Sequence, residues 1–207
     1  MTIAIIGAGN VGQALGQALV RRGEQIRYGV DQPEKQRELP ESLAGAFIGS
    51  NASAIEGADI VILAVPYAAA LHVAQGIPDW DGRILIDATN PLAPGLAGLS
   101  IGTNTSGAEQ VAKHARNARV VKAFNTTGAE NMLEPAYAHG QVFMPVCGDD
   151  AGAREKVVAL ATLLGFDAVD LGPLSAARYL EPFGMTWIHM AIKLGHGRRF
   201  GFALLRR

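Results

Sequence analysis

The sequence contains a single cysteine, Cys147. One thiol excludes an internal disulfide and a cysteine-rich metal site, which favours a reducing compartment. No uninterrupted apolar run in the chain reaches the roughly 18 residues that a membrane-spanning helix needs. The first residues, Met-Thr-Ile-Ala-Ile-Ile-Gly, have neither the basic segment nor the cleavage site of a secretory signal. We therefore expect a cytoplasmic protein without a membrane partner.

Charge is also scarce, because charged residues make up 18% of the chain and the formal net charge is -1. A nucleic-acid surface would need a basic surplus, and a disordered tail would need a block of like charges. The five histidines are scattered, without the spacing that is typical of a metal site. We expect neither nucleic acid nor metal as a partner, and a small-molecule ligand fits better.

Short apolar runs are abundant in this 207-residue chain, which is long enough to bury one real core. Between most of the runs lie stretches with helical periodicity, at residues 11–22, 68–75, 108–115 and 151–164. Continuous apolar runs are typical of parallel strands that helices cover on both faces. The predicted strands are residues 3–6, 26–30, 46–48, 60–65, 84–86, 120–124, 142–146 and 166–169.

This alternation predicts an α/β fold with a Rossmann-like, doubly wound, mostly parallel sheet. We expect a dinucleotide-binding domain over residues 1–147 and a smaller C-terminal part over residues 148–207 with a helical cap. Residues 174–205 show two helical stretches separated near Pro182, and no convincing strand. No flexible linker separates this part from the sheet, so the cap should pack directly on it.

Residues 7–12 read Gly-Ala-Gly-Asn-Val-Gly, directly after the first predicted strand and at the start of the first predicted helix. In a dinucleotide-binding loop the first glycine allows the tight turn, the second lets the backbone approach a pyrophosphate, and the third lets helix and strand pack closely. The amino end of the helix offers unpaired N–H groups to the phosphates. The placement favours a cofactor loop over an unrelated glycine-rich turn.

Polar and turn-forming residues follow three other strands, in Val65-Pro66-Tyr67 and in residues 87–91 and 123–128. Taken singly, each segment is also typical of a turn or a helix cap; Thr127, for example, could cap a helix that contains Glu130. Because the carboxyl ends of parallel strands share one edge of the sheet, the segments should converge on the glycine loop. Together they favour a cofactor cleft.

These segments, with Ser-Gly-Ala-Glu at 106–109, Val-Lys-Ala-Phe-Asn-Thr at 121–126 and Gly-Pro-Leu-Ser-Ala-Ala-Arg at 172–178, resemble the coenzyme F420-dependent NADP oxidoreductases. The cytosolic reductase domain of the STEAP metalloreductases is similar too. The resemblance runs over nearly the whole chain. It implies hydride transfer between a nicotinamide dinucleotide and a flavin-like acceptor, such as the deazaflavin F420 or a flavin, often in a homodimer.

The resemblance also implies which residues hold the two redox partners. The glycine loop would hold the pyrophosphate, and the residues after the predicted strand 60–65 would line the ribose and nicotinamide. Two further strand ends would form the floor of the site where the nicotinamide meets the ring of the acceptor. The cofactor-binding residues implied in this way, including one at the end of the predicted strand 26–30, the acid directly after it and the later basic residue, are Gly7, Ala8, Gly9, Asn10, Val11, Gly12, Val30, Asp31, Lys35, Ala64, Val65, Pro66, Asn90, Pro91, Ala123 and Asn125.

Asp31 departs from the family's usual Gly-Ser-Arg phosphate reader, because this chain reads Gly29-Val30-Asp31, with Lys35 at the later basic place. Asp31 lies 19 residues after Gly12, close to the spacing of about 20 for a ribose-binding acid. A carboxylate accepts both ribose hydroxyls of NAD and repels the 2′-phosphate of NADP, so Asp31 favours NAD over NADP. The alternative is that Asp31 only begins the turn before Pro33, while Lys35 and Arg37 meet a phosphate.

A proton donor for carbonyl reduction is not evident in the sequence. His189, on a predicted helix, is a weak catalytic candidate, and it would be needed if the protein were a dehydrogenase of a small carbonyl compound. A catalytically silent NAD(P)-binding sensor is the other alternative. Hydride transfer between two cofactors needs no such acid. We further expect Lys122 to reach solvent through its stem, and Arg178 with Glu181 to form a surface pair on one helix.

Overall fold

The computed structural model describes residues 1–33, 43 and 45–207. Its centre is a sheet of eight strands, which run in the spatial order β10-β9-β6-β5-β4-β1-β2-β3. All neighbours pair in parallel except β6 and β9, which are antiparallel. The strands are β1 (Thr2–Ile6), β2 (Gln25–Gly29), β3 (Phe47–Gly49), β4 (Ile60–Leu63), β5 (Ile84–Asp87), β6 (Arg119–Lys122), β9 (Phe143–Gly148) and β10 (Asp167–Asp170), with a separate hairpin of β7 (Ala136–Tyr137) and β8 (Gly140–Gln141).

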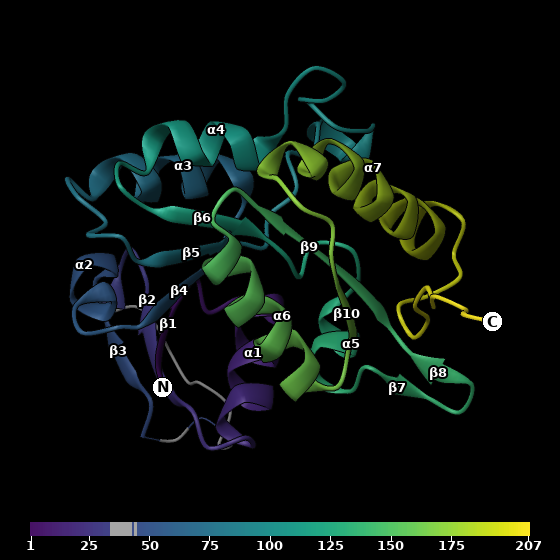
Figure 1. Ribbon diagram of the computed structural model, residues 1–207, viewed down its shortest axis with the longest axis horizontal. Coiled ribbons are helices and arrows are strands. Elements are labelled where there is room, and N and C mark those ends of the chain that lie inside the picture. The colour runs from purple at the N-terminus through teal and green to yellow at the C-terminus, as the bar shows by residue number, and fades with distance from the viewer. Residues whose placement is uncertain (34–42, 44) are drawn as a thin grey trace.

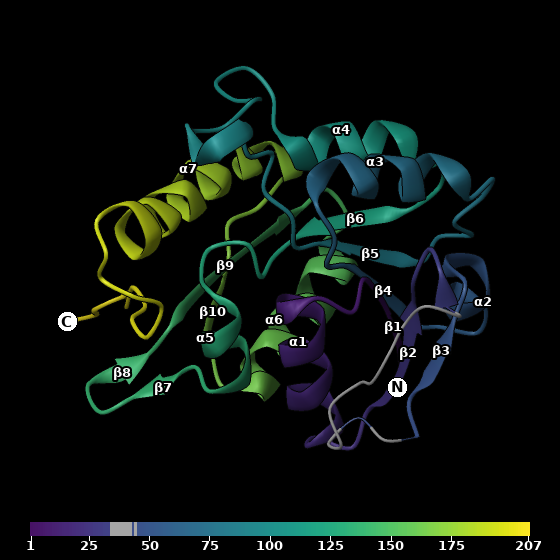
Figure 2. The ribbon, with the colours of Figure 1, turned by 180° about the vertical axis from the view of Figure 1, so that it is seen from behind.

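Helices cover both faces of the sheet, as Figures 1 and 2 show from opposite sides. On one face α1, α5 and α6 pack over one buried apolar cluster, and on the other face α2, α3, α4 and α7 pack over a second cluster. The helices are α1 (Asn10–Val20), α2 (Asn51–Ile55), α3 (Tyr67–Gly76), α4 (Gly107–His114), α5 (Ala129–Leu133), α6 (Ala151–Leu164) and α7 (Ala177–Ile188). The predicted doubly wound, mostly parallel sheet is confirmed.

The central strands have the apolar composition that burial on both faces requires. Every residue of β4 is buried, and its alternate side chains belong to opposite clusters, with Ile60 and Ile62 in one and Val61 and Leu63 in the other. The eight predicted strands all exist, with ends displaced by at most two residues. Burial on both faces therefore explains why these runs do not alternate with polar residues.

The sheet changes winding direction between β1 and β4. The chain leaves β1 into α1 on one face and leaves β4 into α3 on the other. Because the two connections diverge, a crevice opens beyond the carboxyl ends of these strands, which is where open α/β sheets bind ligands. The glycine loop lies at this point in the fold.

The predicted break at Pro182 is wrong, because α7 runs through this residue and continues as a single π-helical turn, His189–Lys193. Proline lacks the N–H that would bond to the carbonyl of Arg178, a loss of one helix hydrogen bond. Burial of one helix face, which includes Leu180, Gly184 and Trp187, holds the helix together across that gap.

The predicted second helical stretch is also wrong beyond Lys193, because no helix is assigned to residues 194–207. Gly195 and Gly197 have positive φ angles, which are incompatible with a right-handed helix. The chain instead turns back, so that Phe200 stacks on Trp187 and the Phe202 carbonyl accepts from the Phe143 N–H at 2.8 Å.

The proposed domain boundary at residue 147 falls inside β9, and β10 adds a further strand to the same sheet. A separate C-terminal domain stays a prediction, and the part after β10 consists mainly of α7 and its extension. Within the described ranges, none of the helices combines the length and apolar character that crossing a bilayer would need.

Candidate functional site

The turn that leaves β1 has a backbone geometry that requires glycine. Gly7 has a φ angle of +104°, and a Cβ atom on it would lie 2.6 Å from the carbonyl oxygen of Ala64. The Gly7 N–H donates to the Gly29 carbonyl at 2.9 Å, which ties the turn to the end of β2. The loop is therefore fixed by both neighbouring strands before any ligand arrives.

Gly12 and Gly9 differ in what surrounds them. A Cβ atom on Gly12 would lie 2.0 Å from the Gly7 carbonyl oxygen, so α1 approaches the loop as closely as the backbone permits. Gly9 is the N-cap residue of α1 and supplies no side-chain cap, and apart from its chain neighbours and the adjoining helix backbone no atom lies within 4 Å of the place where its Cβ would be. The space beside Gly9 is therefore open at the amino end of α1, where an anion can approach the first N–H groups of the helix.

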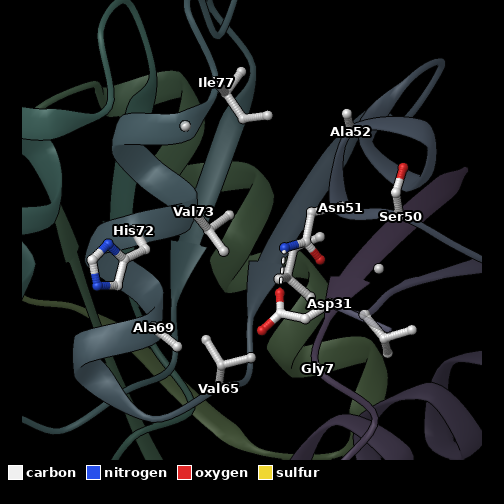
Figure 3. A pocket seen from close by; sticks show the side chains of 14 residues that line it. Gly7, Asp31, Ser50, Asn51, Ala52, Val65, Ala69, His72, Val73 and Ile77 are labelled. Atoms are coloured by element: carbon white, nitrogen blue, oxygen red, sulfur yellow. Dashed lines mark hydrogen bonds between the residues drawn. The ribbon is translucent and has the colours of Figure 1, made fainter. Parts of the chain in front are cut away.

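A cavity of about 560 Å³ adjoins the loop on the side of β2 and β3. Figure 3 shows Asp31 and Asn51 on one wall, with Val65, Val73 and His72 on the other. The Asn51 amide donates to Asp31 Oδ1 at 3.2 Å. Asp31 is the acidic side chain among the residues that line this cavity, and no lysine or arginine of the described chain lines it.

Most of the predicted cofactor residues meet at this cavity or beside it. Gly7, Val30, Asp31 and Val65 line it, and Ala64 and Pro66 flank Val65 in the chain. Lys35 lies outside the described residues. The remaining members of the loop continue from Gly7 into the first turn of α1, and they are Ala8, Gly9, Asn10, Val11 and Gly12.

The predicted floor residues lie together at a different place, under α7. The Asn90 amide donates to the Asn125 carbonyl at 2.8 Å, and the Asn125 amide donates to Asn90 Oδ1 at 2.9 Å and to the Leu180 carbonyl at 3.1 Å. Gly184 of α7 packs so closely that a Cβ on it would lie 2.6 Å from the Asn125 carbonyl oxygen. Pro91 and Ala123 are buried beside this pair.

The prediction that Lys122 reaches solvent is wrong. Its ammonium group is completely buried, 2.8 Å from Asp87 Oδ2 and 3.1 Å from Glu181 Oε1, and both carboxylates are buried as well. Lys122 also donates to the Thr89 carbonyl at 2.6 Å. Asp87 Oδ1 in turn accepts from the Thr89 N–H and hydroxyl. We call these three charged residues the buried triad.

The buried triad fastens α7 to the sheet and to α4. The Glu181 carboxylate accepts from the N–H groups of Gly107 and Ala108 at 2.9 and 3.0 Å, at the amino end of α4. The positive end of the α4 dipole therefore offsets the second negative charge of the triad. Arg178 pairs with Glu109 of α4 at 2.6 Å. The predicted surface pair of Arg178 with Glu181 is wrong, because both residues bind α4.

Burial alone lowers the pKa of the Lys122 ammonium, but Asp87 and Glu181 outweigh burial and hold that pKa above its ordinary value. Burial raises the pKa of the Tyr67 hydroxyl, and the charges of Glu181 and Asp87 raise it further. Burial also raises the pKa of the Cys147 thiol to about 12. Lys122 therefore stays charged at neutral pH, and neither Tyr67 nor Cys147 provides a base or a nucleophile there.

His189 is not near the glycine loop. It is exposed at the end of α7 and lines a second cavity, of about 640 Å³, with Met185, Thr186 and the loop of residues 97–103. Its catalytic role stays a prediction. In the described part of the chain, no three ligating side chains come close enough together to hold a metal ion. The predicted cap at Thr127 is wrong, since α5 begins after Gly128 without a side-chain cap.

Residues 2–91 match the family model described as NADP oxidoreductase, coenzyme F420-dependent. The crystal structure of a protein from Arthrobacter sp. FB24, provisionally named an F420-dependent NADP reductase, is 31% identical. That likeness covers 100% of both chains with a TM-score of 0.88.

Two more distant likenesses extend this picture. The metalloreductase STEAP3 of Rattus norvegicus is 28% identical over 86% of this chain, which spans about a third of that relative, 35% of its length. A reductive aminase from Aspergillus terreus, in complex with NADPH and ethyl-5-oxohexanoate, has a TM-score of 0.70 at 18% identity. At that identity the likeness shows the fold alone.

Proposed function

The chain belongs to the family of coenzyme F420-dependent NADP oxidoreductases, and from this premise we propose that it transfers a hydride between a nicotinamide dinucleotide and a flavin-like acceptor. A deazaflavin such as F420 or a flavin is the proposed acceptor class. The observation that carries the proposal is the open glycine loop at the point where the sheet changes winding direction. We further propose a cytoplasmic protein that acts as a homodimer.

The residues present fit a dinucleotide. The space in front of Gly9 and the first N–H groups of α1 suits the two phosphates. The cavity lined by Asp31 and Asn51 lies on the side of β2, where the adenosine ribose would lie. The ends of β4, β5 and β6, with Pro66, Asn90 and Asn125, would then border the nicotinamide.

The chemistry of the proposed reaction belongs to the bound cofactors, because a nicotinamide supplies the hydride and a flavin-like ring accepts it. This chain would contribute by holding the two redox partners in position. Lys122 and Glu181 fix the strand ends that carry Asn90 and Asn125, and holding two reactants in contact lowers a barrier by several kcal/mol. The cavity beside the glycine loop is lined mainly by apolar residues, with Asp31, Ser50, Asn51 and His72 as its polar side chains. Hydride transfer between two cofactors requires none of them as an acid.

Turnover distinguishes this function from that of a binding protein. Purified protein with NADH or NADPH is expected to reduce at least one acceptor from a panel of F420, riboflavin, FMN and a ferric chelate. The loss of absorbance at 340 nm, which reports oxidation of the dinucleotide, measures this turnover. Binding of the dinucleotide without turnover of any acceptor would contradict the proposed enzyme and would support a sensor.

We also propose that Asp31 makes the protein prefer NAD(H), in contrast to the NADP of the family's name. A carboxylate can accept from the ribose hydroxyls of NAD but repels a 2′-phosphate, and the described lining of the cavity supplies no lysine or arginine to offset that repulsion. The parent protein is therefore expected to bind NADH more tightly than NADPH.

Asp31→Arg is expected to reverse this preference. The ratio of the two dissociation constants should change by at least about tenfold, or about 1.4 kcal/mol, because the guanidinium binds the 2′-phosphate that the carboxylate repelled. Fluorescence titration with NADH and NADPH measures the ratio. Glu155→Arg, an equal charge change at an exposed position of α6, serves as the control. Equal or tighter binding of NADPH by the parent would refute the proposed preference.

A further inference from the structure

Asn51 is the first residue of α2 and lies beside Asp31 on the same wall of the cavity, as Figure 3 shows. Its Nδ2 donates to Asp31 Oδ1 at 3.2 Å. Asp31 itself is exposed and lies just beyond β2, in the turn before Pro33. Without a partner, a carboxylate in such a place would be free to rotate toward solvent. The Asn51 amide is the group that holds it at the cavity.

The position of Asn51 depends on Gly29, the last residue of β2. A Cβ atom on Gly29 would lie 2.9 Å from Asn51 Oδ1 and 3.0 Å from Asn51 Cα. The pairing of Gly29 with Gly49 of β3, and the bond from the Val30 N–H to the Gly49 carbonyl, bring the start of α2 to this place. The strand end is therefore shaped so that α2 can present its first side chain to Asp31.

The orientation of the Asn51 amide has a cost. Its Oδ1 is buried and has no hydrogen-bond partner, and a buried acceptor without a partner is unfavourable. A half-turn of the amide would place Oδ1 against the Asp31 carboxylate, so that two acceptors would face each other. The orientation that binds Asp31 thus leaves Oδ1 unpaired. A residue chosen only for stability at this position would have no such acceptor.

We propose that Asn51 is a positioning residue for the choice of dinucleotide. Because Asn51 occupies Asp31 Oδ1, the other carboxylate oxygen is left to accept from a ribose hydroxyl of a dinucleotide that lacks a 2′-phosphate. A carboxylate held in this way can rotate away from a 2′-phosphate only by breaking its bond to Asn51, which adds to the cost of binding NADP(H). This inference rests on the dinucleotide binding and the role of Asp31 proposed above.

Asn51→Ala tests the proposal through binding, without knowledge of the acceptor. The ratio of the dissociation constants of NADPH and NADH is expected to fall by about three- to tenfold, because Asp31 gains freedom to rotate toward solvent. The melting temperature should stay the same or rise, because the unpaired acceptor is removed. Asn51→Leu, which keeps the shape of the side chain, should behave alike. Asn104→Ala, the same substitution at an exposed position that does not line the cavity, is the control.

A double-mutant cycle with Asp31→Ala separates positioning from a structural role. If Asn51 acts through Asp31, adding Asn51→Ala to Asp31→Ala leaves the ratio unchanged. An unchanged ratio in Asn51→Ala, with a changed one in Asp31→Ala, would overturn the inference but leave the role of Asp31 intact. Equal weakening of both dinucleotides with a lower melting temperature would also overturn it, as a structural effect. If neither variant changes the ratio, the proposed preference fails as well, while turnover still tests the enzyme.

Discussion

Lys122→Met is expected to destabilise the folded protein by about 3–5 kcal/mol, because removing one partner of a buried ionic group leaves uncompensated charge in the interior. Methionine keeps the length of the side chain but offers no charge to Asp87 and Glu181, which are 0% and 1% exposed. The Thr89 carbonyl would lose its donor too. Urea unfolding at pH 7 measures the loss. Lys156→Met, at an exposed position of α6, should change stability by no more than about 0.5 kcal/mol.

A neutral version of the triad shows whether charge imbalance causes the loss. Asp87→Asn and Glu181→Gln, added to Lys122→Met, remove both carboxylates and keep an acceptor for the Thr89 N–H and for one of the Gly107 and Ala108 N–H groups, which bond to different oxygens of Glu181. The triple variant should recover part of the lost stability, because no uncompensated charge is left in the interior. A triple variant that is no more stable than the single one would contradict this explanation.

The stability of the parent, unlike that of the single variant, should depend on the charge of Lys122 at alkaline pH. In the parent, the folded pKa of Lys122 lies above its ordinary value, so its stabilisation is complete below about pH 10.4 and is lost as pH rises through the folded value. Lys122→Met lacks this group, so the difference in stability between the two proteins should narrow over that alkaline range. Urea unfolding at neutral and alkaline pH measures the difference.

The sheet could be predicted from the sequence because its strands are buried on both faces. Segments such as β4 and β5 read as continuous apolar runs, and turn residues mark their ends. The glycine loop was equally visible, since its spacing reflects backbone contacts such as the approach of Gly12 to Gly7. The short helix α2, of five residues, escaped prediction, because one turn of helix leaves almost no periodicity. The equally short α5 was suggested only by a possible cap at Thr127, one residue before the N-cap that the structure shows.

The buried triad could not be predicted from local pattern, because its members come from two strands and a helix far apart in the chain. A lysine at the end of an apolar run normally places its charge in solvent. The signal that could have revealed the pair lies in strand register, since Asp87 and Lys122 are directly opposed at the ends of β5 and β6. Glu181 has no such signal, because the packing of α7 on α4 decides its place.

Pro182 and Asn51 show the same limit in different ways. A proline inside a helical pattern usually marks an end, but the buried face of α7 outweighs one missing hydrogen bond. Asn51 in sequence is an ordinary residue after a serine cap, and only the approach of α2 to Gly29 brings it to Asp31. Tertiary packing decided both cases.

Gly12→Ala is expected to reduce both stability and dinucleotide binding. The new Cβ would lie 2.0 Å from the Gly7 carbonyl oxygen, and since that atom is backbone, the loop and α1 must move apart. Overpacking of this kind costs about 1–3 kcal/mol. The displaced loop would no longer present its N–H groups to the phosphates, so NADH binding should weaken by at least about tenfold, or about 1.4 kcal/mol. Urea unfolding and fluorescence titration measure the two effects, and unchanged values would contradict the close packing.

Gly9→Ala should separate the two effects. Gly9 has a φ angle of −79°, which alanine adopts easily, and apart from the adjoining backbone no atom of the described protein lies within 4 Å of the new Cβ. Alanine is a poorer helix cap than glycine, so the stability loss should be about 1 kcal/mol or less. If the pyrophosphate occupies this space, the methyl group takes its place, and NADH binding falls at least about tenfold, although the fold is kept. A Gly9→Ala protein that binds NADH as the parent does would show that the phosphates lie elsewhere, and the proposed cofactor site would fail with it.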